Sequence, residues 1–93
     1  MMYLVIYDVQ DDRERLFIMR TLQAAGLRRV EYSSYLGPLD LNDAEALAEI
    51  VHAHLGDRDS SYFVPLTSYT TGMTLISTKH GVRRPSQSRL EVT

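Results

Sequence analysis

The chain has 93 residues, of which 44% are hydrophobic and 24% charged, a composition that indicates one small globular domain and excludes wholesale disorder. The absence of cysteine excludes disulfides, iron–sulfur clusters and thiolate nucleophiles. The apolar runs are too short to cross a membrane, and no secretory signal follows Met1. We therefore expect a cytoplasmic protein with no membrane partner.

The net charge of −2 argues against a protein that binds nucleic acid through bulk positive charge. Its distribution is uneven, because residues 40–59 carry six acids and one arginine, whereas residues 60–93 carry four cations and one acid. Nine of the ten cations are arginine, which binds phosphate through two parallel hydrogen bonds. On charge alone, a solvated acidic helix with an ordinary basic tail is the favoured explanation of this pattern.

The first half of the chain predicts a strand, a helix and further strand. Residues 3–7 are a continuous run of β-branched and aromatic residues, typical of a strand covered on both faces. A helix is expected from about residue 12 to 25, with Asp11 as N-cap and Gly26 after its end. Its apolar stripe consists of Ile18, Met19, Leu22 and Ala25. Residues 29–36 predict one bent strand or two short ones, because two serines interrupt them.

The second half predicts another helix and two strands. The helix is expected over residues 41–55, with Asn42 and Glu45 as a capping pair. Strands are expected over residues 61–66 and 72–78, and Pro65 places the first of these at a sheet edge.

This order of elements predicts an α+β domain over residues 1–80, a ferredoxin-like sandwich with both helices on one face of a single sheet. Residues 81–93 are expected to form a flexible basic tail. The second face of the sheet needs cover, and a second copy of the chain is expected to provide it. We therefore expect a homodimer.

Asp8 directly follows the apolar run of the first strand, so its carboxylate is expected in a partly desolvated place. A carboxylate there is paired, hydrogen-bonded or bound to a cation. A turn-capping role and a metal or acid–base role both fit. One carboxylate is too few for a magnesium site, and two copies of Asp8 across a two-fold axis would supply the second.

Arginines and tyrosines gather near the predicted first helix and second strand. Arg15 lies three residues before Ile18, so it is expected on the core-facing side of the first turn, next to Asp8. It either extends to water or points at a phosphate or carboxylate. Arg28 and Arg29 precede Tyr32 and Tyr35, an alternation that suits either a nucleic-acid surface or the wet face of a sheet.

Taken together, these motifs resemble the small CRISPR-associated nucleases of spacer acquisition, the "Cas two" family. The resemblance covers roughly residues 2–81 and rests on the order and spacing of short motifs. These motifs are Tyr7-Asp8-Val9, Asp11-Asp12, Arg15, the segment from Gly26 to Gly37, Val64-Pro65-Leu66-Thr67 and the segment from Gly72 to Gly81.

The resemblance implies a ferredoxin-like homodimer whose final strand pairs with the partner's sheet. It implies that Asp8 from each copy holds a divalent cation, usually magnesium, at the two-fold axis. Tyr7, Arg15 and Arg29 match positions associated with activity, and Tyr35, which we also expect among the catalytic residues, stands where the family has phenylalanine. Members are described as metal-dependent endonucleases of RNA or DNA, and as the duplex-DNA-binding scaffold of the integrase that inserts new spacers.

Three residues depart from the family pattern, since Glu31 replaces a glutamine, Ser34 a valine, and Phe17 a second arginine of some members. A metal-dependent endonuclease and a catalytically silent DNA-binding scaffold are both compatible with the resemblance. In the scaffold, Arg15, Arg28, Arg29, Arg83 and Arg84 would contact phosphates and the CRISPR integrase would be the protein partner. A ferredoxin-like ribonuclease toxin is the alternative outside the family.

Overall fold

The structure is a computed structural model that describes residues 1–84, apart from the side chain of Arg83. Its elements, in chain order, are β1 (Met2–Asp8), α1 (Asp12–Ala24), β2 (Arg28–Glu31), β3 (Ser34–Pro38), α2 (Leu41–His52), β4 (Ser60–Leu66), α3 (Ser68–Gly72), β5 (Ile76–Thr78) and β6 (Gly81–Arg83). In the described part of the chain, no helix has the length and apolarity needed to cross a membrane.

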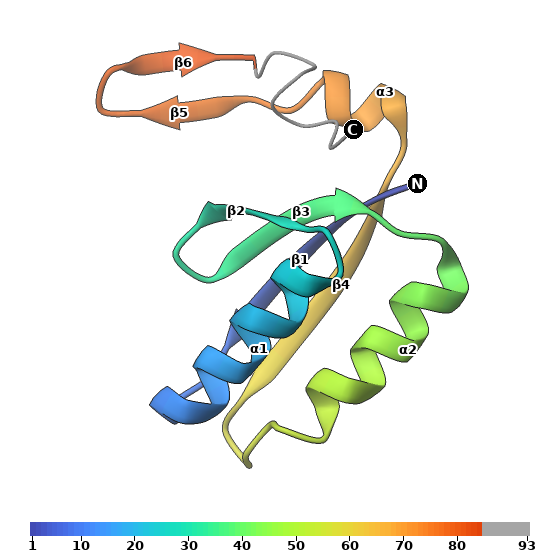
Figure 1. Ribbon diagram of the computed structural model, residues 1–93. Coiled ribbons are helices and arrows are strands. Elements are labelled where there is room, and N and C mark those ends of the chain that lie inside the picture. Colours follow the sequence, from blue (N-terminus) through green and yellow to red (C-terminus); the bar gives the residue numbers. More distant parts are fainter. Residues whose placement is uncertain (85–93) are drawn as a thin grey trace.

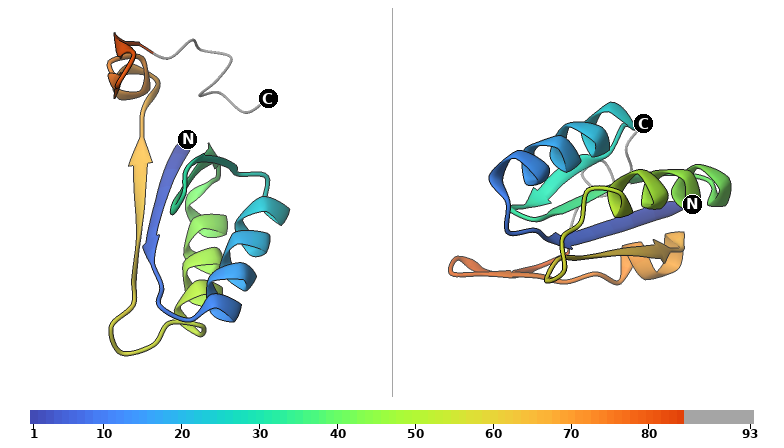
Figure 2. Two further views of the ribbon diagram at one scale, coloured as in Figure 1. Left: turned by 90° about the vertical axis from the view of Figure 1, so that its left-hand side faces the viewer. Right: turned by 90° about the horizontal axis from the view of Figure 1, so that it is seen from below.

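Four strands form one antiparallel sheet in the order β2-β3-β1-β4, with α1 and α2 on the same side (Figures 1 and 2). The central strand β1 pairs along its length with β4, from Met2 opposite Leu66 to Asp8 opposite Ser60. The predicted ferredoxin-like sandwich is therefore confirmed. Pro65 lies on β4 at the sheet edge, as predicted, where its missing N–H costs no ladder hydrogen bond.

The sequence signals at both ends of α1 are confirmed. The Asp11 carboxylate accepts hydrogen bonds from the backbone N–H groups of Arg13 and Glu14, both at 2.9 Å. An N-cap of this kind stabilises a helix by about 1 kcal/mol. Gly26 follows the helix with φ +94°, a left-handed conformation that favours glycine. Ala25, expected in the buried stripe, is exposed because it lies one residue beyond the helix as its C-cap.

The second helix begins at the predicted residue but has different caps. Asp40, in extended conformation, accepts a hydrogen bond from the backbone N–H of Asp43 at 2.7 Å, so the predicted cap at Asn42 is wrong. Asn42 is already inside the first turn, where its backbone is helical. The helix ends at His52, three residues earlier than predicted.

The segment between the helices contains two strands, which settles the choice left open by the sequence. A turn at Tyr32 and Ser33 separates β2 from β3, and the pairing shifts between Arg29 and Glu31, which is a β-bulge. Gly37 lies against the backbone of Leu27, where an added Cβ would come within 2.9 Å of the Leu27 Cα. The absence of a side chain at Gly37 therefore allows β3 to lie close to Leu27, the residue just before β2.

The C-terminal part differs from the prediction. Residues 68–72 form the short helix α3, which the side chains of Thr67 and Thr70 cap reciprocally, so the strand expected over residues 72–78 is confined to β5. β5 pairs with β6 in a hairpin that projects beyond the end of the main sheet (Figure 1). Residues 81–83, expected in the flexible tail, are thus a strand. The rest of the predicted tail, residues 85–93, lies outside the described residues.

The core lies between the sheet and the two helices. On β1 the residues Tyr3, Val5 and Tyr7 are buried, because alternate side chains of a strand face the helices. They pack against residues of α1, α2 and β3, which are Ile18, Leu22, Ala44, Leu47, Val51 and Tyr35.

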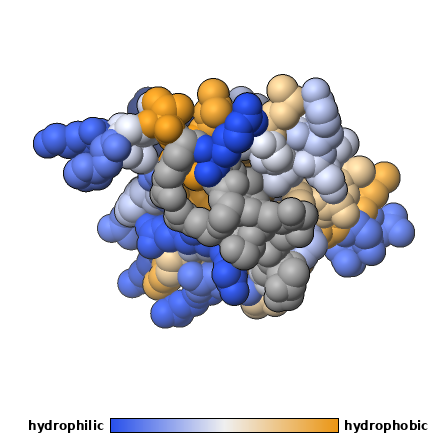
Figure 3. All heavy atoms as spheres, turned by 90° about the horizontal axis from the view of Figure 1, so that it is seen from above, coloured by the Kyte–Doolittle hydropathy of each residue, from blue (hydrophilic) through white to orange (hydrophobic). Residues whose placement is uncertain are grey.

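The opposite face of the sheet is apolar and open in a single copy, as expected for a sheet whose second face needs cover from elsewhere. Ile6 is 41% exposed, and the neighbouring Tyr62 and Val64 on β4 are exposed as well. We call the face formed by Leu4, Ile6, Tyr62 and Val64 the open face. Further large side chains are exposed in the segment from α3 to β6, namely Tyr69, Met73, Leu75 and Val82. Seen from above, the surface of the molecule carries hydrophobic residues among hydrophilic ones (Figure 3).

Candidate functional site

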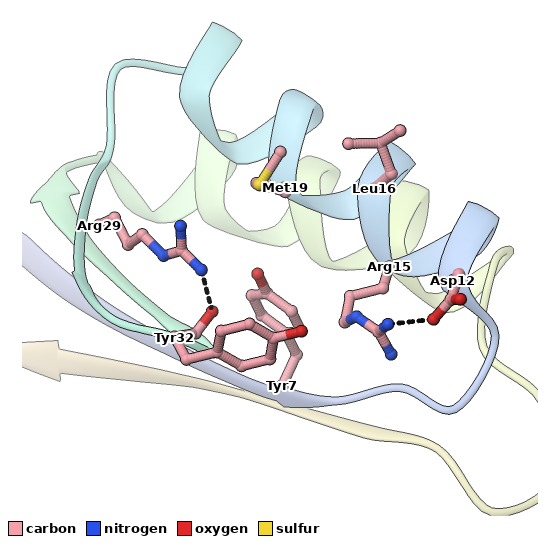
Figure 4. Close-up of a pocket in the computed structure, with 7 residues that line it drawn as sticks. All are labelled: Tyr7, Asp12, Arg15, Leu16, Met19, Arg29 and Tyr32. Atoms are coloured by element: carbon pink, nitrogen blue, oxygen red, sulfur yellow. Dashed lines mark hydrogen bonds and ion pairs between the residues drawn. The ribbon is translucent and has the colours of Figure 1, made fainter.

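A pocket of about 280 Å³ lies between α1 and the turn that joins β2 to β3 (Figure 4). It is on the helix side of the sheet. It combines two guanidinium groups, two phenols, one carboxylate and two apolar side chains, contributed by Arg15, Arg29, Tyr7, Tyr32, Asp12, Leu16 and Met19. We call it the arginine–tyrosine pocket.

Arg15 is held at one end of the arginine–tyrosine pocket. Its Nη1 donates a hydrogen bond to the backbone carbonyl of Val9 at 2.8 Å, and its Nη2 forms an ion pair with Asp12. The hydrogen bond with Asp12 is the main cause that raises the pKa of Arg15. The contact with Val9 is possible because the first turn of α1 faces the end of β1, as the sequence predicted. The guanidinium is therefore fixed in direction and permanently charged.

Arg29 and Tyr32 form the other end. The Nη2 of Arg29 donates to the backbone carbonyl of Tyr32 at 3.2 Å, and the guanidinium carbon lies 5.2 Å from the centroid of the Tyr32 ring. A cation–π contact at an exposed site contributes about 0.5–1 kcal/mol. The Tyr32 side chain extends from Arg29 toward Arg15 (Figure 4), so it spans the pocket from one arginine to the other.

Tyr7 forms the floor. Its ring is buried and stacks on Tyr35 with centroids 6.3 Å apart, while its hydroxyl points up into the pocket (Figure 4). Burial raises the pKa of Tyr7, and Tyr35 adds to the effect, whereas the positive charges of Arg29 and Arg15 lower it. The phenol is therefore neutral at physiological pH and can donate a hydrogen bond.

Asp8 lies apart from this pocket. It follows Tyr7 on β1, so its side chain leaves the sheet on the opposite face, the same face as Ile6. Asp8 is exposed, and its Oδ1 accepts a hydrogen bond from the Nε2 of Gln10 at 3.3 Å. The expected desolvation is thus wrong for a single copy, because nothing in the described chain covers that end of the open face. Arg15, expected beside Asp8, contacts the carbonyl of Val9 instead.

The other predicted site residues occupy three different places. Tyr35 is fully buried beneath Tyr7, and its hydroxyl accepts a hydrogen bond from the Nε2 of Gln23 at 3.4 Å. Arg28 is exposed at the start of β2. Arg84 is exposed and donates to the carbonyl of Gly72 at 3.2 Å. Of the predicted catalytic residues, the pocket brings together Tyr7, Arg15 and Arg29.

Sequence reasoning does not assign Tyr32, Asp12, Leu16 or Met19 to a shared site. The alternation of arginine and tyrosine after residue 28 is a signal for Tyr32, but it does not show which face the ring occupies. The apolar residues Leu16 and Met19 have the spacing of ordinary helix positions.

Phe17 lies outside the arginine–tyrosine pocket. At this position some members of the family that the sequence resembles carry arginine. The Phe17 ring stacks on His54 with centroids 3.8 Å apart. The Nδ1 of His54 lies 2.6 Å from the Oε2 of Glu14. The contacts of His54 with Phe17 and Glu14 join α1 to the segment after α2. Phe17 therefore has a structural role in this protein.

A two-layer ferredoxin-like domain carries two separate polar features, the arginine–tyrosine pocket on the helix side of the sheet and a carboxylate on its open face. This architecture places the protein in the class of small α+β sandwich proteins in which a single chain leaves one face of its sheet uncovered. The family model described as CRISPR associated protein Cas2 matches residues 1–74. The chain belongs to this family.

Relatives and solved structures agree with this assignment. The chain is 34% identical over 92 residues to "CRISPR-associated endoribonuclease Cas2 1" of Archaeoglobus fulgidus, covering 98% of each protein. A protein of the same description from Pyrobaculum aerophilum is 38% identical over 55 residues, covering 59% of this chain and 58% of that protein.

Among solved structures, Streptococcus pyogenes Cas2 matches with a TM-score of 0.60 and 25% identity, covering 72% of this chain and 87% of the other. A hypothetical protein from Thermus thermophilus matches in fold with a TM-score of 0.69 and 22% identity, covering 91% of this chain and 96% of the other.

Proposed function

We propose that the protein is a metal-dependent endonuclease that acts as a homodimer in CRISPR spacer acquisition, together with the integrase. The observation that carries the proposal is the position of Asp8 at the end of β1 on the open face. A second copy that covers this face about a two-fold axis near Asp8 would bring in a second carboxylate. The endoribonuclease names of the A. fulgidus and P. aerophilum relatives support the reaction class.

The residues present fit a magnesium ion only in such a dimer. Within the described part of one copy, no group of three histidine or acidic side chains could hold a metal. Asp8 offers an exposed carboxylate whose one hydrogen bond within residues 1–84 is a long one, from the Gln10 amide. Two such carboxylates with water ligands match the usual demands of magnesium. When bound, the cation would activate water and neutralise charge on the scissile phosphate.

The chain's own residues would bind and orient the nucleic acid. Arg15 and Arg29 are charged, anchored by backbone carbonyls and open to the pocket, so they would hold backbone phosphates. Tyr35 would act as a positioning residue, because it supports the Tyr7 ring from below without reaching the pocket.

The test is cleavage of RNA and DNA by wild-type protein and by Asp8→Asn, with magnesium or with EDTA. We expect Asp8→Asn to lower cleavage by at least about 100-fold, since metal coordination contributes several kcal/mol. EDTA should abolish cleavage by the wild type. Light scattering should show the same dimer for both proteins. Undiminished cleavage by Asp8→Asn would refute the proposed mechanism.

A catalytically silent DNA-binding scaffold is the second candidate. Arg28 and Arg84, both exposed, favour it because neither lies in the arginine–tyrosine pocket or near Asp8. Duplex binding through such arginines should fall steeply with salt concentration, and Arg28→Ala should reduce the slope by about 1. A flat salt response would contradict this role.

A further inference from the structure

We propose that the arginine–tyrosine pocket binds one unpaired nucleotide, with its phosphate between Arg15 and Arg29 and its base against Tyr32. This proposal deepens the proposed nuclease function and rests on it for the class of ligand. Such a pocket would make the chain bind single-stranded nucleic acid more tightly than duplexes. The residues responsible would lie on the face of the sheet opposite Asp8.

The two arginines provide the anion half of the pocket. Each is anchored by a backbone carbonyl, Arg15 to Val9 at 2.8 Å and Arg29 to Tyr32 at 3.2 Å, so little side-chain freedom is lost on binding. A guanidinium has five N–H donors, and these anchors leave further donors for a phosphate. The Tyr7 hydroxyl points into the pocket toward the same space (Figure 4).

Tyr32 and two residues of α1 provide the half that a planar base would contact. The Tyr32 residue is 65% exposed, although its guanidinium partner lies only 5.2 Å from the ring centroid. Leu16 and Met19 of α1 also line the pocket and add apolar surface to it. An inorganic anion or a carboxylate would leave this aromatic and apolar surface unused. A nucleotide uses both halves at once.

The size of the pocket distinguishes a single strand from a duplex. Its volume of about 280 Å³ lies just below the range of about 300–1,000 Å³ typical of ligand pockets, and it suits one nucleotide. A base within a duplex is stacked and paired, so it cannot reach Tyr32 without leaving the helix. An unpaired base has its face free for stacking on an aromatic ring.

The first experiment titrates adenosine monophosphate into the full chain, followed by NMR, with adenosine and inorganic phosphate as separate probes. We expect the monophosphate to bind more tightly than either probe and to shift the ring signals of Tyr32. Tyr32→Ala should weaken its binding by about 5- to 100-fold, whereas Tyr32→Phe should retain most of it. Tyr69→Ala is the matched control, because Tyr69 is 74% exposed on α3 and should bind as the wild type does.

Equal binding by Tyr32→Ala and the wild type would overturn the proposal, as would an equal loss in Tyr69→Ala. Tighter binding of a glutamate-rich peptide than of the monophosphate would also overturn it, in favour of a protein partner. Far-UV circular dichroism on each variant checks that the fold is retained, and Tyr32→Phe keeps the ring if Tyr32→Ala does not fold.

The second experiment compares a short single-stranded oligonucleotide with its duplex, by fluorescence anisotropy on Asp8→Asn protein in EDTA. We expect tighter binding of the single strand and a loss of that preference in the Tyr32→Ala, Asp8→Asn double variant. Equal affinity for both forms would refute the pocket's role. This outcome is distinct from failure of the nuclease proposal, which is judged by whether Asp8→Asn still cleaves.

Discussion

Tyr7 and Asp8 are consecutive residues of β1, yet their side chains leave the sheet on opposite faces. Tyr7 is buried on the helix side and forms the floor of the arginine–tyrosine pocket, whereas Asp8 is exposed on the open face beyond Ile6. Two residues that belong to one sequence motif therefore lie on opposite sides of the sheet, one at the arginine–tyrosine pocket and one at the proposed metal site. The two can accordingly be perturbed separately.

Asp12→Asn should strengthen binding of single-stranded oligonucleotides. Asp12 pairs with Arg15 at the pocket rim, where its charge opposes an incoming phosphate. Removing one unit charge at about 4 Å in a watery site is worth ~1 kcal/mol, or about 5-fold in affinity. Fluorescence anisotropy at low salt measures the effect.

Asp43→Asn is the control for net charge, because Asp43 occupies the first turn of the other helix. It should change affinity by less than about 2-fold, as expected for a screened and distant charge. Weaker binding by Asp12→Asn would contradict the prediction, and would indicate that Asp12 mainly fixes the orientation of Arg15.

Ile6→Lys should convert the proposed dimer into a monomer. Ile6 is 41% exposed in the centre of the open face, so a lysine there can reach water in the single chain but would be buried unpaired in a dimer. Ile50→Lys is a close match, since Ile50 is 46% exposed on α2 and should leave assembly unchanged. Sedimentation velocity distinguishes the two variants, and an unchanged sedimentation coefficient for Ile6→Lys would exclude the open face as the interface.

Gly37→Ala should destabilise the fold by about 1–3 kcal/mol, because overpacking forces the backbone apart. The added Cβ would lie 2.9 Å from the Cα of Leu27. Gly72→Ala is the matched control, because an added Cβ there would meet no heavy atom within 4 Å and the φ of Gly72 is not positive. Urea unfolding should show a lower midpoint for Gly37→Ala and a midpoint near or above wild type for Gly72→Ala.

Phe17→Arg, which introduces the residue found in some members of the family, should cost stability without altering the pocket. Phe17 stacks on His54 at 3.8 Å, and an aromatic pair contributes about 0.5–1.5 kcal/mol. Combined with His54→Ala in a double-mutant cycle, the two losses should not add, because they break the same contact. Additive losses, or a changed affinity for adenosine monophosphate, would contradict this assignment.

The elements of the sandwich could be predicted from periodicity and caps, because Asp11, Gly26 and the apolar stripes are local signals. α3 could not, since the polar residues 68–72 have no apolar stripe and their helix depends on the reciprocal cap of Thr67 and Thr70. The sequence does not single out the cap at Asp40, because Asn42 offers a similar signal two residues later.

Three of the seven pocket residues, Tyr7, Arg15 and Arg29, were expected as site residues, but the other four and the arrangement of all seven were not. Strand alternation already implies that Tyr7 and Asp8 face apart, yet the family motif groups them. The place of Tyr32 depends on a turn and on the bulge between Arg29 and Glu31, whose geometry is not encoded by spacing alone. The exposure of Asp8 depends on whether a second copy covers the open face, which lies beyond one chain.

The alternation along β1 also constrains how this segment can change over evolutionary time. Variation at Tyr3, Val5 and Tyr7 affects the core and the pocket floor. In the proposed dimer, variation at Leu4, Ile6 and Asp8 would instead affect contacts with the second copy. A comprehensive mutational scan would show two phenotypes that alternate with a period of two residues. A one-residue deletion in the strand would exchange the two sets, so substitutions are tolerated here far more readily than changes in length.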